Sequence, residues 1–193
     1  MKKLGMSVAG LVMAAAFAAP AQANLVTNGG FEMRDFSGWT QTGDSVFNGV
    51  LCDTGDSAIH AGSCSAYLGS YDASGIEQSI NVGAAGLAWN LSFAFKSESG
   101  SPSNFSVLFD GQTLLSLADP SAGDYTLFHF SGLTTGENMT LAFNFFDQGF
   151  GNVFLDAVSV TTAPAEVPEP ATLALMGAGL AGLLFSRRRK TKA

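Results

Sequence analysis

Two cysteines, Cys52 and Cys64, are the first candidates for chemistry, and the chain has no others. The chain begins with Lys2 and Lys3, an uncharged apolar stretch and Ala21-Gln22-Ala23, a pattern typical of secretory signal peptides, so the pair should meet an oxidising compartment and form a disulfide. The bond would close the loop CDTGDSAIHAGSC and contribute about 3 kcal/mol. A metal-binding pair is the alternative, but it lacks further cysteine ligands and His60 alone supports it poorly.

One carboxylate falls inside an apolar strand pattern. In FLDAVSV, Asp156 alternates in step with Phe154, Val158 and Val160. In a regular strand these four side chains would lie on one face, so Asp156 would point toward the core. A buried charge has to be paired or metal-bound. Two alternatives remain open: a bulge turns the side chain outward, or the carboxylate accepts backbone N–H groups of the opening segment.

Aromatic rings on a rigid surface can stack on sugar rings, while acids and amides accept the sugar hydroxyls. Trp89 has the apolar parity of its strand and is expected in the core. Trp39, Tyr67 and Tyr71 fall in or near expected loops and are the candidates for ligand contact. Plain packing is the alternative for each, and Trp39 follows a Ser-Gly turn that suits a structural tryptophan.

Catalysis and nucleic-acid binding have little support in the composition. Neither His60 nor His129 sits in a nucleophile or metal-hydrolase motif. Only Arg34 and Lys96 are basic between residues 24 and 166, against 15 of the 16 acidic residues, so this span has a formal charge of −13. A phosphate-binding surface needs cations, so nucleic-acid binding is excluded. Divalent cations and neutral, hydroxyl-rich ligands are compatible with this charge.

Alternating apolar residues dominate the middle of the chain and predict β-strands. The clearest stripe runs from Leu87 to Phe95, with Trp89, Leu91 and Phe93 between them. No long stretch outside the two ends has a helical period. We therefore expect an all-β, antiparallel sandwich over residues 24–163. Strands are expected at 44–51, 64–69, 76–82, 87–96, 105–109, 112–117, 125–130, 138–145 and 152–160.

Four stretches resemble a jelly-roll domain of the galactose-binding-like, carbohydrate-binding-module type. They are NLVTNGGFEMRDFSGWTQTG, GIEQSINV, LSFAFKS and the closing FLDAVSV. Such domains often hold a structural Ca²⁺ near the joined chain ends. The resemblance implies that Glu32 and Asp156 occupy the ligand positions here. No cofactor is otherwise required.

The first 23 residues read as a secretory signal peptide. Lys2 and Lys3 form a positive start, an uncharged apolar stretch follows, and Ala21-Gln22-Ala23 suits signal peptidase. A short membrane anchor is the alternative.

The tail, residues 164–193, predicts a linker, a short membrane helix at 171–186 and a basic end. Residues 171–185 carry no charge, and as a helix they would span about 22 Å. The basic block should stay on the cytoplasmic side of the inner membrane, which leaves the bulk of the chain outside. A buried helix of a soluble domain is the alternative. The block consists of Arg187, Arg188, Arg189 and Lys190.

The same tail resembles the PEP-CTERM sorting signal of Gram-negative bacteria over residues 166–190. The motif is Val167-Pro168-Glu169-Pro170, followed by the short helix and the arginine-rich end. The resemblance implies an exosortase-type protease as partner, cleavage near the motif and release to the cell surface or extracellular matrix. The two prolines keep the motif out of the following helix.

These observations favour an exported, non-catalytic adhesion or glycan-binding module associated with exopolysaccharide or biofilm. A surface structural protein without a specific ligand is the first alternative. A polysaccharide hydrolase is a more distant one, since it needs two carboxylates across a cleft.

Overall fold

The protein is described by a computed structural model of the 193-residue chain. The described residues are 22–52, 57–69, 71–98, 103–148 and 151–163. Within these ranges all regular structure is β, and no helix has the length and apolar character to cross a bilayer. The predicted signal peptide (except residues 22 and 23), the membrane helix at 171–186 and the basic tail lie outside them.

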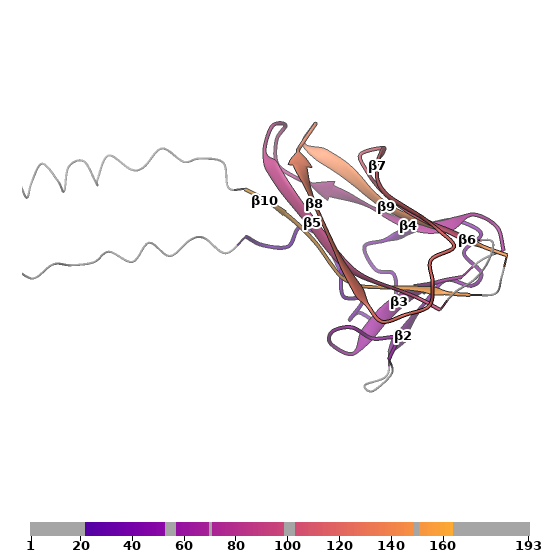
Figure 1. The fold of residues 1–193 in the computed structure, drawn as a ribbon. Helices are drawn as coiled ribbons and strands as arrows, with labels where there is room; N and C mark the ends of the chain where they lie inside the picture. Colours follow the sequence, from indigo (N-terminus) through magenta and orange to yellow (C-terminus); the bar gives the residue numbers. More distant parts are fainter. Residues whose placement is uncertain (1–21, 53–56, 70, 99–102, 149–150, 164–193) are drawn as a thin grey trace, which may run out of the picture.

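Ten strands form two five-stranded antiparallel sheets packed face to face, which confirms the predicted β-sandwich (Figure 1). Sheet A has the order β1-β4-β9-β6-β7, and sheet B has the order β2-β3-β10-β5-β8. The strands of sheet A are β1 (Thr40–Gly43), β4 (Ser74–Asn81), β9 (Asn138–Asp147), β6 (Ser103–Phe109) and β7 (Gln112–Ala118). Those of sheet B are β2 (Gly49–Cys52), β3 (Cys64–Leu68), β10 (Val153–Thr162), β5 (Ala88–Ser97) and β8 (Thr126–Leu133).

Aromatic side chains from the two sheets meet in the core. Phe93 of β5 packs edge-on against Phe143 of β9, with ring centroids 5.2 Å apart. Phe95 lies 4.4 Å from Phe105 of β6 by the same measure. All four are buried, so the alternation in β5, β6 and β9 places the rings where the sequence predicts. Such pairs add about 0.5–1.5 kcal/mol each beyond the area they bury.

One predicted strand is shorter than expected. The sequence predicts a strand over 44–51, whereas only Gly49–Cys52 pairs, as β2. Asp44 accepts a bond from the backbone N of Val46, and the N of Asn48 donates to the carbonyl of Ser45. Such local bonds compete with a strand ladder. Residues 44–48 therefore form the connection from β1 in sheet A to β2 in sheet B.

The opening residues of the domain are fixed beside the end of β10. The side chain of Asn24 donates to the carbonyl of Val158 at 3.0 Å and accepts from the N of Val160 at 3.0 Å. The N of Leu25 also donates to the carbonyl of Val160. The first and last described residues of the domain thereby lie at the same end of the sandwich (Figure 1).

Candidate functional site

Asp156 lies on the outer face of sheet B, so the inward direction expected for a regular strand is wrong and the alternative, a bulge that turns the side chain outward, is confirmed. Asp156 stands opposite Ala94 in the β10–β5 ladder, on the face of β5 that turns away from the core. The register shifts between Asp156 and Ser159, and Ala157 has a left-handed φ of 50°. This bulge changes the parity of the strand, so Val158 faces the core cluster and Asp156 does not.

Although it faces outward, Asp156 is fully buried. Residues 57–63, the covering segment, lie over it. One carboxylate oxygen accepts bonds from the backbone N of His60 (2.9 Å) and of Ala61 (2.8 Å). The other accepts from the N of Ala157 at 2.6 Å. Asp156 therefore binds backbone N–H groups, but none of them belongs to the opening segment as that alternative expected: two come from the covering segment and one from Ala157 of its own strand.

Burial raises the pKa of the Asp156 carboxyl above its usual range, because the charged form loses water. The backbone bonds from Ala61, Ala157 and His60 act against this shift, and so does the charge of His60. Desolvation is the largest of these effects. Asp156 is therefore a carboxylate held by directed N–H groups at a dry site.

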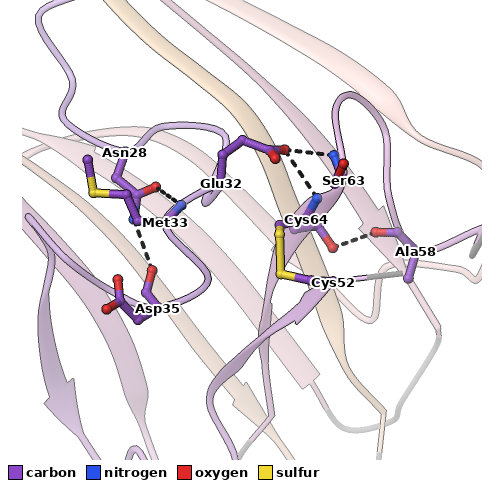
Figure 2. The surroundings of a disulfide bond; sticks show 9 residues. Asn28, Glu32, Met33, Asp35, Cys52, Ala58, Ser63 and Cys64 are labelled. Carbon is purple, nitrogen blue, oxygen red and sulfur yellow. Dashed lines mark hydrogen bonds between the residues drawn. A yellow bond between two sulfur atoms is a disulfide. The ribbon is translucent and has the colours of Figure 1, made fainter. Parts of the chain in front are cut away.

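Glu32 of the opening segment holds the other end of the covering segment (Figure 2). Its Oε1 accepts from the backbone N of Ser63 at 2.8 Å and of Cys64 at 3.1 Å. Gly62, at φ 71°, leaves room for this carboxylate, since a Cβ there would lie 2.1 Å from Oε1. Glu32 thus ties the start of β3 to the opening segment.

The predicted disulfide between Cys52 and Cys64 is confirmed. The two residues stand opposite each other in the β2–β3 ladder, and the bond lies beside the Glu32 contacts (Figure 2). The covering segment is therefore held by a covalent bond at its base and by two carboxylates along its length.

The two carboxylates predicted to bind calcium flank one glycine. A Cβ on Gly30 would lie 3.8 Å from Oδ1 of Asp156 and 3.8 Å from Cγ of Glu32. Carboxylate oxygens are the ligands that Ca²⁺ prefers, but the ion takes six to eight of them. Among the described residues no group of three or more His, Cys, Asp or Glu side chains could hold a metal. Five backbone N–H groups already bind the two carboxylates, so a calcium ion would share their oxygens.

Trp39, one of the three aromatic candidates, belongs to the core. Only 7% of its surface is exposed. Its ring stacks on Phe31 at 5.8 Å and contacts Phe143 at 5.9 Å, and its indole N–H donates to the carbonyl of Asn28. Its aromatic face is covered, as the packing alternative requires.

Tyr67 is half-buried and packs on the neighbouring strand. It stands opposite Gly49 in the β2–β3 ladder. A Cβ on Gly49 would lie 2.3 Å from the Tyr67 hydroxyl, so only glycine leaves room for the ring. Tyr67 therefore helps to hold β2 against β3.

Tyr71 is the candidate that remains at the surface, with 41% of its area exposed. Its ring meets Phe47 edge-on, with centroids 6.0 Å apart, and Phe47 is 50% exposed. Sequence reasoning missed Phe47, because it placed residues 44–51 in a strand. The signal was present in Asp44 and Asn48, which favour turns and bracket the ring.

Amide and carboxylate groups lie beside this aromatic pair. Asn48 accepts from the N of Gly69 at 3.2 Å, while its buried Nδ2 has no hydrogen-bond partner within the described part. A Cβ on Gly69 would lie 2.3 Å from Oδ1 of Asn152 and 3.4 Å from the carbonyl of Phe47. Asn152 in turn donates to Glu98 at 2.9 Å. We call Phe47, Asn48, Tyr71, Glu98 and Asn152 the loop-end cluster.

The loop-end cluster and the joined chain ends lie at opposite ends of β10. Asn152 directly precedes the first residue of β10, whereas Asn24 bonds near its last residues. A ten-residue strand is about 33 Å long. The cluster therefore faces away from the point where the described chain ends, at residue 163.

Solved structures with the same fold include carbohydrate-binding modules. TmCBM61, in complex with β-1,4-galactotriose, superposes with a TM-score of 0.63 at 16% identity, covering 73% of this chain and 99% of the module. The CBM22-1 xylan-binding domain of Paenibacillus barcinonensis Xyn10C gives 0.50 at 19% identity, covering 77% and 99%. The enzymatically active domain of bacteriophage CBA120 tailspike protein 4 gives 0.55 at 20% identity, but only 21% of that chain is covered. The similarity thus spans whole binding modules and a minor part of the enzyme.

The tail matches a protein-family profile described as the PEP-CTERM protein-sorting motif, over residues 166–190. The match includes the predicted Val-Pro-Glu-Pro motif and the basic block. Comparison with curated proteins gives no match.

Proposed function

We propose that this protein is an exported, non-catalytic glycan-binding module that binds sugars at the loop-end cluster. The observation that carries the proposal is the exposed pair Phe47 and Tyr71, on a sandwich whose similar structures include whole carbohydrate-binding modules. The sorting motif supports export.

The chemistry of the cluster suits a neutral glycan. Two rings at an interplanar angle of 75° present an apolar corner to the C–H faces of a sugar, and nearby amides and a carboxylate can accept hydroxyls. The formal charge of −13 over residues 24–166 disfavours anionic polymers. Uncharged polysaccharides are therefore the expected class.

Retention of the full chain on immobilised β-1,4-galactan and xylan tests this proposal. Phe47→Ala with Tyr71→Ala should weaken retention at least about tenfold, which corresponds to about 1.4 kcal/mol. Met33→Ala, which removes a 59% exposed side chain of the opening segment, is the matched control and should not change retention. Trp39→Ala removes a core ring and should lower the stability rather than act at the sugar.

Failure of the wild-type chain to bind these polymers, or any neutral glycan on an array, would reject the proposal. Equal retention of the Phe47/Tyr71 variant and the wild type would reject the cluster as the site. Turnover of a bound polysaccharide would move the protein to the hydrolases.

We propose further that sorting follows the tail. The helix at 171–186 would hold the chain in the inner membrane with its C-terminus in the cytoplasm. An exosortase-type protease would cut near Pro168-Glu169-Pro170, after signal peptidase has removed residues 1–23. The product would reach the cell surface or an exopolysaccharide matrix.

Calcium at Glu32 and Asp156 remains a proposal of the same kind. An ion bound only by the folded chain would raise the melting temperature with its concentration. Added Ca²⁺ should stabilise the wild type, and Glu32→Gln should remove most of that gain. Indifference of the melting temperature to both calcium and chelator would reject the calcium site.

A further inference from the structure

Four strands form the edges of the two sheets: β1 and β7 in sheet A, and β2 and β8 in sheet B. An edge strand exposes unpaired N–H and C=O groups, and proteins protect such edges with short strands, bulges, charges or proline. β1 and β2 have four residues each. The pairing of β7 with β6 has a register shift between Val107 and Leu108, which is a bulge or irregularity at that edge.

β8 has none of these protections. It has eight residues, pairs with β5 without interruption and contains no Asp, Glu, Lys, Arg or Pro. Among the described strands, β5 is its only ladder partner. β8 is therefore the edge most open to a further strand.

The ladder with β5 determines which backbone groups of β8 are free to pair. The N of Thr134 donates to the carbonyl of Leu87, in line with the pairing of Leu133 and Ala88. Hydrogen-bonded pairs alternate along an antiparallel ladder, so the even-numbered residues of β8 direct their N–H and C=O groups toward β5. The odd-numbered residues direct theirs toward the open edge. These are Leu127, His129, Ser131 and Leu133.

We propose that β8 pairs antiparallel with β8 of a second copy of this chain, across a two-fold axis at Phe130. This register sets Leu127 opposite Leu133 of the second copy, and His129 opposite its Ser131. All four residues with outward backbone groups then lie in hydrogen-bonded pairs. The two copies of sheet B become one continuous ten-stranded sheet.

The side chains of β8 suit this register. Leu127 is 54% exposed and Leu133 is 65% exposed, and the two-fold axis brings each against the other across the seam. Phe128 and Phe130 are half-buried and stack against Phe93, so the axis also joins the aromatic layers of the two copies. β8 contains no Asp, Glu, Lys or Arg, so this pairing places no like charges opposite each other. Most surfaces of a strongly acidic domain would repel a second copy.

This surface is separate from the loop-end cluster and goes beyond the proposed function. Two single-cysteine variants of the full chain test the register, Leu127→Cys and Leu133→Cys. Hydrogen-bonded antiparallel pairs have Cα atoms about 5.5 Å apart, which suits a disulfide. Mild oxidation should cross-link the mixed variants, whereas either variant alone should stay uncross-linked. Cross-linking of a single variant as strong as that of the mixture, or none in the mixture, overturns the proposal.

Charge substitution gives an independent test by sedimentation of the full chain in mild detergent. Leu127→Lys with Leu133→Lys places cations opposite each other and should abolish the dimer. Ala88→Lys with Asn90→Lys is the matched control, because both residues are exposed on the same face of β5, one strand inside the edge. The control should remain a dimer. A wild type that stays monomeric at all concentrations, or a Leu127/Leu133 variant that still dimerises, overturns the pairing.

Discussion

At the scale of single residues, Asp156 shows how a buried carboxylate sets a dependence on pH. Its pKa is raised above the usual 3.8, first by desolvation. The folded chain therefore keeps this proton at pH values where the unfolded chain has lost it, and stability from this group falls as the pH rises above 3.8. We predict that the stability advantage of the wild type over Asp156→Asn shrinks between about pH 4 and pH 7.

Urea unfolding of both proteins across this pH range measures the difference between their free energies of unfolding. The other titratable groups are the same in both proteins, so their contributions largely cancel in this difference. His60 is the titratable residue whose charge counters the shift. Asp35→Asn is the contrasting control. A hydrogen bond from Ser37 lowers the pKa of Asp35. The stability advantage of the wild type over Asp35→Asn should therefore be lost only as the pH falls below 3.8. An Asp156 advantage that grows with pH would contradict the assignment.

The sequence predicted which residues matter more reliably than it predicted their surroundings. The parity of FLDAVSV singled out Asp156 as a charge that needs partners, and it has them. A bulge that turns Asp156 outward was one of the open alternatives, but the sequence could not decide for it, because no residue type at Ala157 demands a left-handed φ. Phe47 was missed because the apolar residues Val46 and Phe47 were interpreted as part of a strand. The turn-favouring residues on either side of them, Asp44 and Asn48, were not given enough weight.

At the scale of elements, the disulfide and the covering segment act together. The bond closes the loop from β2 to β3, and the covering segment in that loop supplies two of the N–H groups that hold Asp156. We predict that Cys52→Ser with Cys64→Ser lowers the free energy of unfolding by about 3 kcal/mol. Denaturant unfolding measures this loss, and the reduced wild type should match the double variant. A change below about 1 kcal/mol would mean that the segment is held without the bond.

The apolar alternation predicted the long strands that bury one face, and it missed the short strand β1. β5, β6 and β9 alternate large apolar and small or polar residues, and each buries one face. β1 is Thr-Gln-Thr-Gly, largely exposed, and its sequence carries no apolar period. Its pairing with β4 comes from tertiary contacts that a local pattern does not record.

At the scale of the whole molecule, the proposed sorting depends on the tail, which matches the PEP-CTERM protein-sorting motif. Under the proposed sorting, we predict that Pro168→Ala with Pro170→Ala would let the helix proposed at 171–186 extend through the motif, because two N–H groups are restored. The protease would then lack an extended substrate, and the uncut chain should accumulate in the membrane fraction. Immunoblots of membrane and extracellular fractions measure this, with Thr172→Ser as the control substitution in the tail. Normal release of the double variant would contradict the role of the prolines.

The position of β10 has a mechanical consequence. It lies between β3 and β5 in sheet B, with the loop-end cluster at its first residue and the tail beyond its last. A bound polymer and a membrane anchor would therefore pull along the strand axis in opposite directions. Such tension loads the cross-strand bonds on both flanks in shear, so that they resist together instead of opening one after another.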